Sequence, residues 1–189
     1  MAKKNNNVSL KEICLSSGLV FGGIDYGLGK MIGQDFNDPN NIVHYMFGAW
    51  NDLFYKEANK YDVFKALKTS GNVDLSIVEK SNQSVDPNSI RTNIIPVISR
   101  SEIQKHVENY SFINKEGYAI VFIHEFYCKP YQNASYWVVV IEKSTNLVVW
   151  AKPIKVIAKG GFGFKNYWAT TILNLILEIK KRQKTWEKR

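Results

Sequence analysis

The chain has few of the residue types that build metal sites, disulfide frameworks or membrane spans. Its two cysteines, Cys14 and Cys128, and its three histidines stand at no metal-binding spacing, so we expect no metal and no cofactor. Each cysteine is expected to be a small apolar filler, although a single disulfide between them stays open if the protein is exported. No run of about 18 apolar residues occurs, so the sequence predicts no transmembrane segment.

Acidic residues are scarce in the last part of the chain. Residues 151–189 hold ten Lys and Arg against two Asp and Glu, whereas residues 1–150 hold 15 of each, so the net charge of +8 belongs to the C-terminal part. One interpretation is a solvated helix end, where cations complement the helix dipole. The alternative is a contact with an anionic ligand, a membrane surface or a nucleic acid. The candidate basic patch consists of Lys180, Lys181, Arg182 and Lys184.

The first residues, MAKKNNN, are polar and lack the apolar segment of a secretory leader. Taken as given, the chain is expected to be cytoplasmic, whereas a mature chain whose leader was removed would be periplasmic or envelope-bound. Hydrophobic residues make up 45% of the sequence, which is enough for one core at this length. We therefore expect a loose lead-in over residues 1–12, a single domain over residues 13–184 and a basic tail over residues 185–189.

The order of apolar patterns predicts an α+β fold. The expected architecture is a two-layer α/β sandwich: a mixed sheet of about five strands, with two long helices and one short helix packed mainly on one face. Asp38-Pro39 is a good helix start, and Ser99 with Glu102 forms a capping box. The expected strands are residues 13–24, 73–77, 117–128, 135–142 and 147–157, the long helices residues 39–67 and 166–184, and the short helix residues 99–110.

Two connections have informative turn chemistry. Residues 143–146 join the last two strands, and Asn146 is expected to take a left-handed conformation there. Residues 79–96 are predicted to be a polar loop that is long for a compact domain.

A glycine-rich corner, GGFGFKN over residues 160–166, separates the last strand from the last helix. It resembles a dinucleotide-binding motif but has Asn at the third glycine and follows a late strand, so that interpretation is weak. Free N–H groups at the helix start, with Lys165 close by, would suit an anion. We favour a structural role, in which the glycines permit a tight turn while Phe162 and Phe164 fill the layer between sheet and helix. The candidate ligand residues here are Gly161, Gly163, Lys165 and Asn166.

A second candidate site follows the first strand. The segment GGIDYGLGK looks superficially like a phosphate loop, but Ile24 and Met31 replace residues that such a loop needs. Asp25, Tyr26 and Lys30 nevertheless lie just past a strand end, where open α/β sheets bind ligands.

Glu125 is a polar residue within a predicted central strand. Because neighbouring strand residues point to opposite faces, His124 and Glu125 are not expected to share a ligand. Glu125 is expected to lie at the strand end in water or to pair with Lys129 or Lys30. No nucleophile and base stand together, so we assign no catalytic residue.

A set of motifs is informative when taken together: Asp25-Tyr26, Trp50-Asn51, Glu57, Lys60-Tyr61-Asp62 and residues 161–169. This set resembles a family of small, mostly uncharacterised exported bacterial proteins, whose most specific segment is a GFGF-basic-NYWA pattern. More distantly, the element order and the hairpin over residues 144–150 are similar to the small α/β domain of the curli-secretion lipoprotein CsgG, of penicillin-binding-protein activator lipoproteins and of the amino-terminal domain of TolB. This resemblance implies a non-enzymatic assembly domain of the cell envelope.

The function expected from the sequence is a non-catalytic interaction module with a protein partner, which docks through a sheet edge or through the loops around Asp25 and Gly161. The alternative is binding of an anionic ligand, a membrane surface or a nucleic acid by the basic patch. A hydrolase-like enzyme using Asp25, Glu125 and Lys165 is a third hypothesis.

Overall fold

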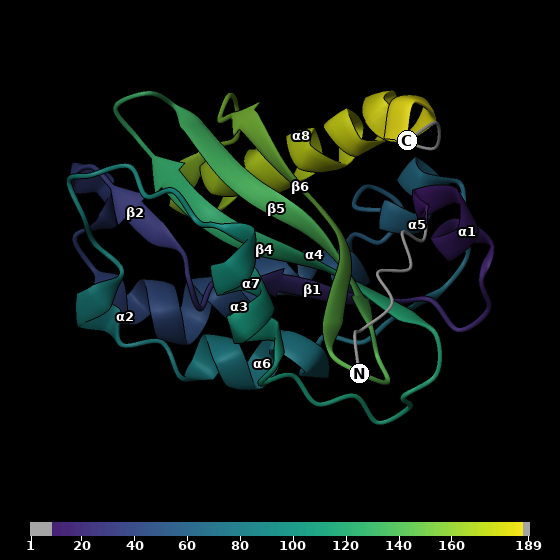
Figure 1. Ribbon diagram of the computed structural model, residues 1–189. Coiled ribbons are helices and arrows are strands. Elements are labelled where there is room, and N and C mark those ends of the chain that lie inside the picture. Colours follow the sequence, from purple (N-terminus) through teal and green to yellow (C-terminus); the bar gives the residue numbers. More distant parts are fainter. Residues whose placement is uncertain (1–8, 187–189) are drawn as a thin grey trace.

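The computed structural model of the chain describes residues 9–186 (Figure 1). Its strands are β1 (Val20–Asp25), β2 (Lys30–Ile32), β3 (Asn72–Val73), β4 (Tyr118–Cys128), β5 (Asn133–Glu142) and β6 (Leu147–Ile157). Its helices are α1 (Leu10–Leu15), η1 (Gln34–Phe36), α2 (Pro39–Asn41), η2 (Ile42–Met46), α3 (Phe47–Asn51), α4 (Leu53–Lys56), α5 (Val63–Leu67), α6 (Ser76–Gln83), η3 (Pro87–Ser89), α7 (Arg100–Val107) and α8 (Gly163–Trp186).

The six strands form one mixed sheet. The main order is β3-β1-β4-β5-β6, and β2 also pairs with β4. β1 and β2 run parallel to β4, whereas β4, β5 and β6 form an antiparallel meander. The α+β class, the mixed sheet and the long C-terminal helix packed on it are therefore confirmed.

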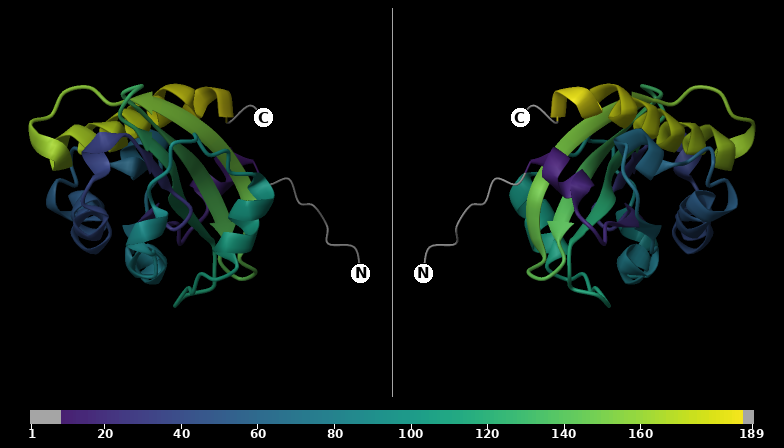
Figure 2. Two further views of the ribbon diagram at one scale, coloured as in Figure 1. Left: turned by 90° about the vertical axis from the view of Figure 1, so that its left-hand side faces the viewer. Right: turned by 90° about the vertical axis from the view of Figure 1, so that its right-hand side faces the viewer.

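Helices cover both faces of the sheet. Alternate residues of β4 point to opposite sides, with Phe122 in the larger core beneath α8 and Val121 in a second core beneath α6 and α7. In Figure 1, α7 lies in front of the sheet and α8 behind it, and Figure 2 shows the same separation from the sides. Most helices contact the larger core, as expected, but α6 and α7 enclose a distinct apolar layer.

The first expected long helix is broken into several pieces. Asp38 caps its start by accepting a hydrogen bond from the Asn41 amide, and Pro39 occupies the first position, as predicted. The chain then passes through the π-helix η2, and α4 ends at Lys56. Asp62 caps a new helix, α5, by accepting from the Lys65 amide. The apolar residues after Asp62 therefore belong to a second helix that keeps the period of the first.

The strand predicted over residues 73–77 is wrong beyond Val73. The Asp74 carboxylate accepts hydrogen bonds from the amide and hydroxyl of Ser76, which bends the chain into α6. Ile77 and Val78 then face the core from consecutive helical positions. The predicted polar loop over residues 79–96 consequently begins with most of α6 and also contains η3.

The N-terminal boundary also differs from the prediction. Ser9 and Glu12 form a capping box that starts α1. This helix includes the last residues of the expected lead-in and the first residues of the strand expected over residues 13–24. β1 begins only at Val20. Residues 1–8 and 187–189, which include most of the lead-in and of the basic tail, lie outside the described residues.

The later elements follow the prediction closely. Ser99 and Glu102 form the expected capping box at the start of α7. Asn146 has φ of 55° in the turn between β5 and β6, as expected for a left-handed residue. β4 is buried along almost its whole length at the centre of the sheet, which explains why its sequence is apolar on both faces.

Candidate functional site

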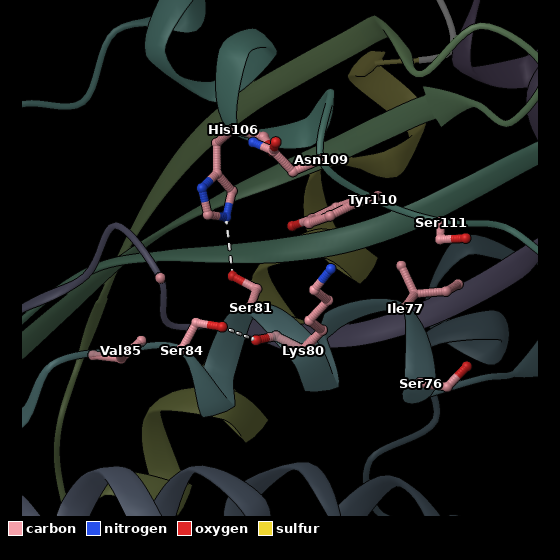
Figure 3. A pocket seen from close by; sticks show the side chains of 11 residues that line it. Ser76, Ile77, Lys80, Ser81, Ser84, Val85, His106, Asn109, Tyr110 and Ser111 are labelled. Atoms are coloured by element: carbon pink, nitrogen blue, oxygen red, sulfur yellow. Dashed lines mark hydrogen bonds between the residues drawn. The ribbon is translucent and has the colours of Figure 1, made fainter.

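A pocket of about 450 Å³ lies between α6 and α7, on the face of the sheet opposite α8 (Figure 3). We call it the α6–α7 pocket. Figure 3 shows the side chains of α6 below this space and those of α7 and the segment after it above. Its lining consists of Gly27, Ser76, Ile77, Lys80, Ser81, Ser84, Val85, His106, Asn109, Tyr110 and Ser111.

Asp25, the last residue of β1, is fully buried beside this pocket. Its carboxylate accepts hydrogen bonds from the Gly27 amide (2.6 Å), the Tyr110 hydroxyl (2.6 Å), His106 Nε2 (2.9 Å) and the Ser81 hydroxyl (3.0 Å). We call these five residues the Asp25 cluster. The four donors match the acceptor capacity of a carboxylate and tie β1, α6 and α7 together.

Two buried asparagines hold the end of β1 in place. Asn82 accepts from the Tyr26 amide at 2.7 Å and donates to the Ile24 carbonyl, while Asn51 accepts from the Ile24 amide at 2.7 Å. Gly23 has φ of 92°, and a Cβ there would lie 2.6 Å from the Asn51 side-chain oxygen. Position 23 therefore requires glycine, and the backbone conformation that it permits directs the Asp25 side chain toward α6 and α7.

The charge on Asp25 controls the two ionisable groups that contact it. Burial alone would lower the pKa of His106, but the hydrogen bond to Asp25 and its charge outweigh burial, and this pKa is raised. Burial raises the pKa of Tyr110 well above its ordinary value, and Asp25 raises it further. Tyr110 therefore stays a neutral donor, and His106 favours its cationic form.

The cluster contains Asp, His and Ser but lacks the geometry of a catalytic triad. Ser81 Oγ lies 3.3 Å from His106 Nε2, yet the same nitrogen lies 2.9 Å from the Asp25 carboxylate. A proton on Nε2 is needed for that bond, so Nε2 cannot also accept the proton of Ser81. Ser81 instead donates to Asp25 and acts as one of its fixed ligands.

The other predicted residues of the β1 end do not join the pocket. Tyr26 is fully buried and stacks on Phe47 with ring centroids 4.1 Å apart, so it is a core residue. Lys30 Nζ donates to the Ser89 carbonyl at 2.7 Å, which fastens β2 to η3.

Glu125 is buried and is not paired with Lys129 or Lys30, so both alternatives expected for it, a place in water and an ion pair, are wrong. It accepts from the Ile98 amide at 2.9 Å and from the Ser135 hydroxyl at 2.6 Å, at a bulge in β4. Lys129 bonds Asp35 instead, at 2.8 Å. The hydrolase hypothesis placed Asp25, Glu125 and Lys165 together, but neither of the last two lines the pocket beside Asp25.

The glycine-rich corner differs from its expected packing. Phe164 contacts Phe36 and Trp50, with centroid distances of 5.8 and 6.0 Å, but Phe162 is 94% exposed. The expectation that both rings fill the core is therefore wrong for Phe162. The left-handed backbone of Gly161 and Gly163, with φ of 77° and 80°, turns the chain so that only the second ring faces inward. Asn166 donates to the Phe162 carbonyl, and the Lys165 carbonyl accepts from Trp50 Nε1.

The two phenylalanines provide a matched test of this corner. Phe164→Ala is expected to lower the free energy of unfolding by about 2 kcal/mol, because a partly buried ring loses its contacts. Phe162→Ala is expected to change it by less than about 0.5 kcal/mol, because the ring is exposed. Urea denaturation of both variants measures the difference. Equal losses would contradict the described packing.

The basic patch is partly neutralised by its own helix. Glu178 accepts from Lys181 at 2.7 Å and from Arg182 at 3.2 Å, at spacings of three and four residues along α8. Lys180 and Lys184 are exposed. This arrangement fits a solvated helix surface at least as well as a binding surface.

Ser81, His106 and Tyr110 were not predicted to be site residues. Residue 81 was predicted to lie in a loop, and neither His106 nor Tyr110 was predicted to contact a ligand. His106 and Tyr110 are four residues apart, a spacing that places two side chains on one face of a helix. That spacing was the available signal, but it does not indicate Asp25 as the shared partner.

Within residues 9–186, no three His, Cys, Asp or Glu side chains gather as a metal site would require. Among the described helices, none has both the length and the apolar character needed to cross a bilayer. Cys128 is buried at the end of β4 with a free thiol.

No family model matches the chain, and neither the search of curated proteins nor that of solved structures gives a match. The family resemblance stays a prediction.

Proposed function

We propose that the chain is a non-catalytic interaction module that binds a protein partner at the α6–α7 pocket. The observation that supports this most is the Asp25 cluster, in which four donors occupy the carboxylate. A general base needs a free acceptor, and Asp25 has none to spare. The cluster supports a rigid, polar pocket wall, as expected of a binding site built on fixed elements.

Docking by strand addition, the other route expected from the sequence, receives less support. The Val148 amide and carbonyl at the outer edge of β6 are bonded to Gln104 and Arg100 of α7. Further along β6, Pro153 lacks an amide donor, and Lys152 and Lys155 are exposed; both features discourage strand pairing. At the opposite edge, β3 has only two residues. The pocket is therefore the better docking surface.

A bacterial cell-envelope location is part of this proposal and rests on the sequence resemblance. Binding of an anionic surface or a nucleic acid by the basic patch stays a prediction from composition. The ion pairs of Glu178 remove part of the charge that motivated it.

Filling the pocket tests the proposal. A photo-crosslinker at Ser111 identifies the partner in a native extract, and calorimetry with the purified partner then measures the affinity. Ser111→Trp places an indole at the pocket wall and is expected to weaken binding at least tenfold. Ser101→Trp, on an exposed part of α7 outside the pocket, is the matched control and is expected to bind normally. Equal affinities for the two variants, or chemical conversion of the bound partner, would refute the proposal.

A further inference from the structure

We propose that the α6–α7 pocket recognises an oxyanion, a carboxylate or a phosphoryl group, through Lys80 and His106. This inference rests on the proposed function and specifies the group that the partner would present. Three features support it: the charges that line the pocket, the donors that have no partner within residues 9–186, and the fixed position of the imidazole.

The charged lining of the pocket is entirely cationic. Lys80 and His106 line it, and no Asp or Glu does so among the described residues. The Asp25 carboxylate beside the pocket is completely inaccessible and already has four donors. The Asp74 carboxylate bonds Ser76, a lining residue, but is not itself part of the lining. A ligand in the pocket therefore meets cationic side chains and no carboxylate in the lining itself.

Lys80 is free to act on a ligand. Figure 3 shows its ammonium group directed from α6 toward the α7 side of the pocket. Within residues 9–186, Lys80 Nζ makes no hydrogen bond or ion pair; Glu178, by contrast, holds Lys181. Lysine is a flexible point charge that commonly contacts phosphate and carboxylate groups.

His106 is held rigidly with one nitrogen engaged. Nε2 bonds Asp25, whereas Nδ1 has no hydrogen-bond partner in the part of the chain that the structure describes. The side chain is 17% exposed, so solvent and ligands reach part of the ring. In the cationic form both nitrogens donate, and the imidazolium adds positive charge to the pocket wall. In Figure 3 its Nδ1 lies on the side of the ring away from Lys80, so its contribution is the charge and not a hydrogen bond shared with Lys80. Ser111, whose hydroxyl is likewise unbonded within the described range, adds a neutral donor at the pocket wall.

Binding should depend on pH through His106. The groups that face this imidazole are Asp25 from β1, Ser81 and Lys80 from α6, and Tyr110 from its own segment. Asp25 favours the cation, and the raised pKa of His106 agrees with that. Oxyanion affinity is therefore expected to fall as pH rises through this pKa.

Sulfate and acetate are suitable probes, because neither titrates near neutral pH. Each is added to the full chain in low-salt buffer, with sodium chloride as the ionic-strength control, and amide NMR signals of Gly27 and Ser111 are followed. Both signals are expected to shift with a saturable dependence. Lys80→Gln is expected to weaken binding about tenfold, since one charged hydrogen bond is lost. Lys105→Gln, which removes a charge from α7 outside the pocket, is expected to leave binding unchanged.

The pH readout separates recognition from folding. His106→Gln keeps a side-chain donor within reach of Asp25 but removes the titration, so its weaker binding should no longer vary with pH. Preference for sulfate supports a phosphoryl group, and preference for acetate supports a carboxylate. Absence of saturable shifts with both probes, or equal binding by the Lys80 and Lys105 variants, would overturn the inference. If one of these contrary results occurs while Ser111→Trp still weakens partner binding, only the oxyanion assignment fails. If Ser111→Trp also has no effect on partner binding, the proposed function fails too.

Discussion

Asp25→Ala is expected to lower the free energy of unfolding by about 3–5 kcal/mol. The substitution leaves the Gly27 amide, the two hydroxyls and His106 Nε2 without their common acceptor in a largely buried region. An unsatisfied buried donor is costly because water no longer compensates for its lost partner. The charge of His106 also loses its counterion.

Urea denaturation measures this effect, and Asp38→Ala is the matched control. Asp38 also accepts from a backbone amide, at the start of α2, but it is exposed. Loss of such a helix cap is expected to cost about 1 kcal/mol. A similar loss in the two variants would show that the Asp25 cluster does not hold β1, α6 and α7 together.

Acid is expected to destabilise the protein through His124. This side chain is fully buried among Tyr26, Tyr127 and Tyr136, and neither ring nitrogen makes a hydrogen bond of ordinary geometry within residues 9–186. Burial lowers its pKa to about 3, and the Phe126 backbone offsets only part of this shift. The unfolded chain therefore binds a proton below its ordinary pKa of 6.5, whereas the folded chain does not.

The lowered pKa of His124 determines the direction in which stability changes with pH. Stability falls as pH falls from 6.5 toward about 3, with a slope that approaches about 1.4 kcal/mol per pH unit. His106 acts in the opposite sense: its raised pKa adds stability that is fully present below 6.5 and is lost as pH rises through the folded value. Because His106 is present in every variant compared, its contribution cancels.

His124→Phe isolates the effect. Between pH 6.5 and a pH two units lower, the wild-type protein is expected to lose about 2 kcal/mol more of its free energy of unfolding than this variant. His44→Gln, which changes an exposed histidine outside this group of rings, is the matched control. Equal slopes in the wild-type protein and His124→Phe, measured by urea denaturation at each pH, would contradict the assignment.

The sequence predicted the C-terminal half of the fold well, and physical reasons explain this. β4, β5 and β6 have 10 or 11 residues each, so their apolar patterns are long enough to be unambiguous. Asn146 supplies the left-handed turn, and a capping box starts α7. Each local preference agrees with the final fold.

The N-terminal half was harder to predict because its signals are short. Val73, Leu75 and Ile77 alternate as in a strand, yet the Asp74 bonds to Ser76 start a helix within that pattern. The residues on either side of Asp62 keep helical spacing although they belong to separate helices. A few apolar residues do not distinguish these cases.

The site was only partly predictable. Asp25 was identified because it lies just past a strand end, where open α/β sheets bind ligands. Its side-chain donors lie 56, 81 and 85 residues away, for Ser81, His106 and Tyr110 respectively. Their convergence depends on α6 and α7 covering the second face of the sheet, and α6 was not expected. Phe162 shows a related limit, since composition does not indicate which of two rings turns inward.

The pKa of His106, measured by NMR titration of its ring signals, tests most directly whether Asp25 holds a cation at the pocket. A value above 6.5 is expected in the intact protein and a lower value in Asp25→Asn, because the neighbouring charge is then absent. A value at or below 6.5, unchanged in the variant, would mean that Asp25 does not hold a cation at the pocket. The anion-binding assignment would then be contradicted.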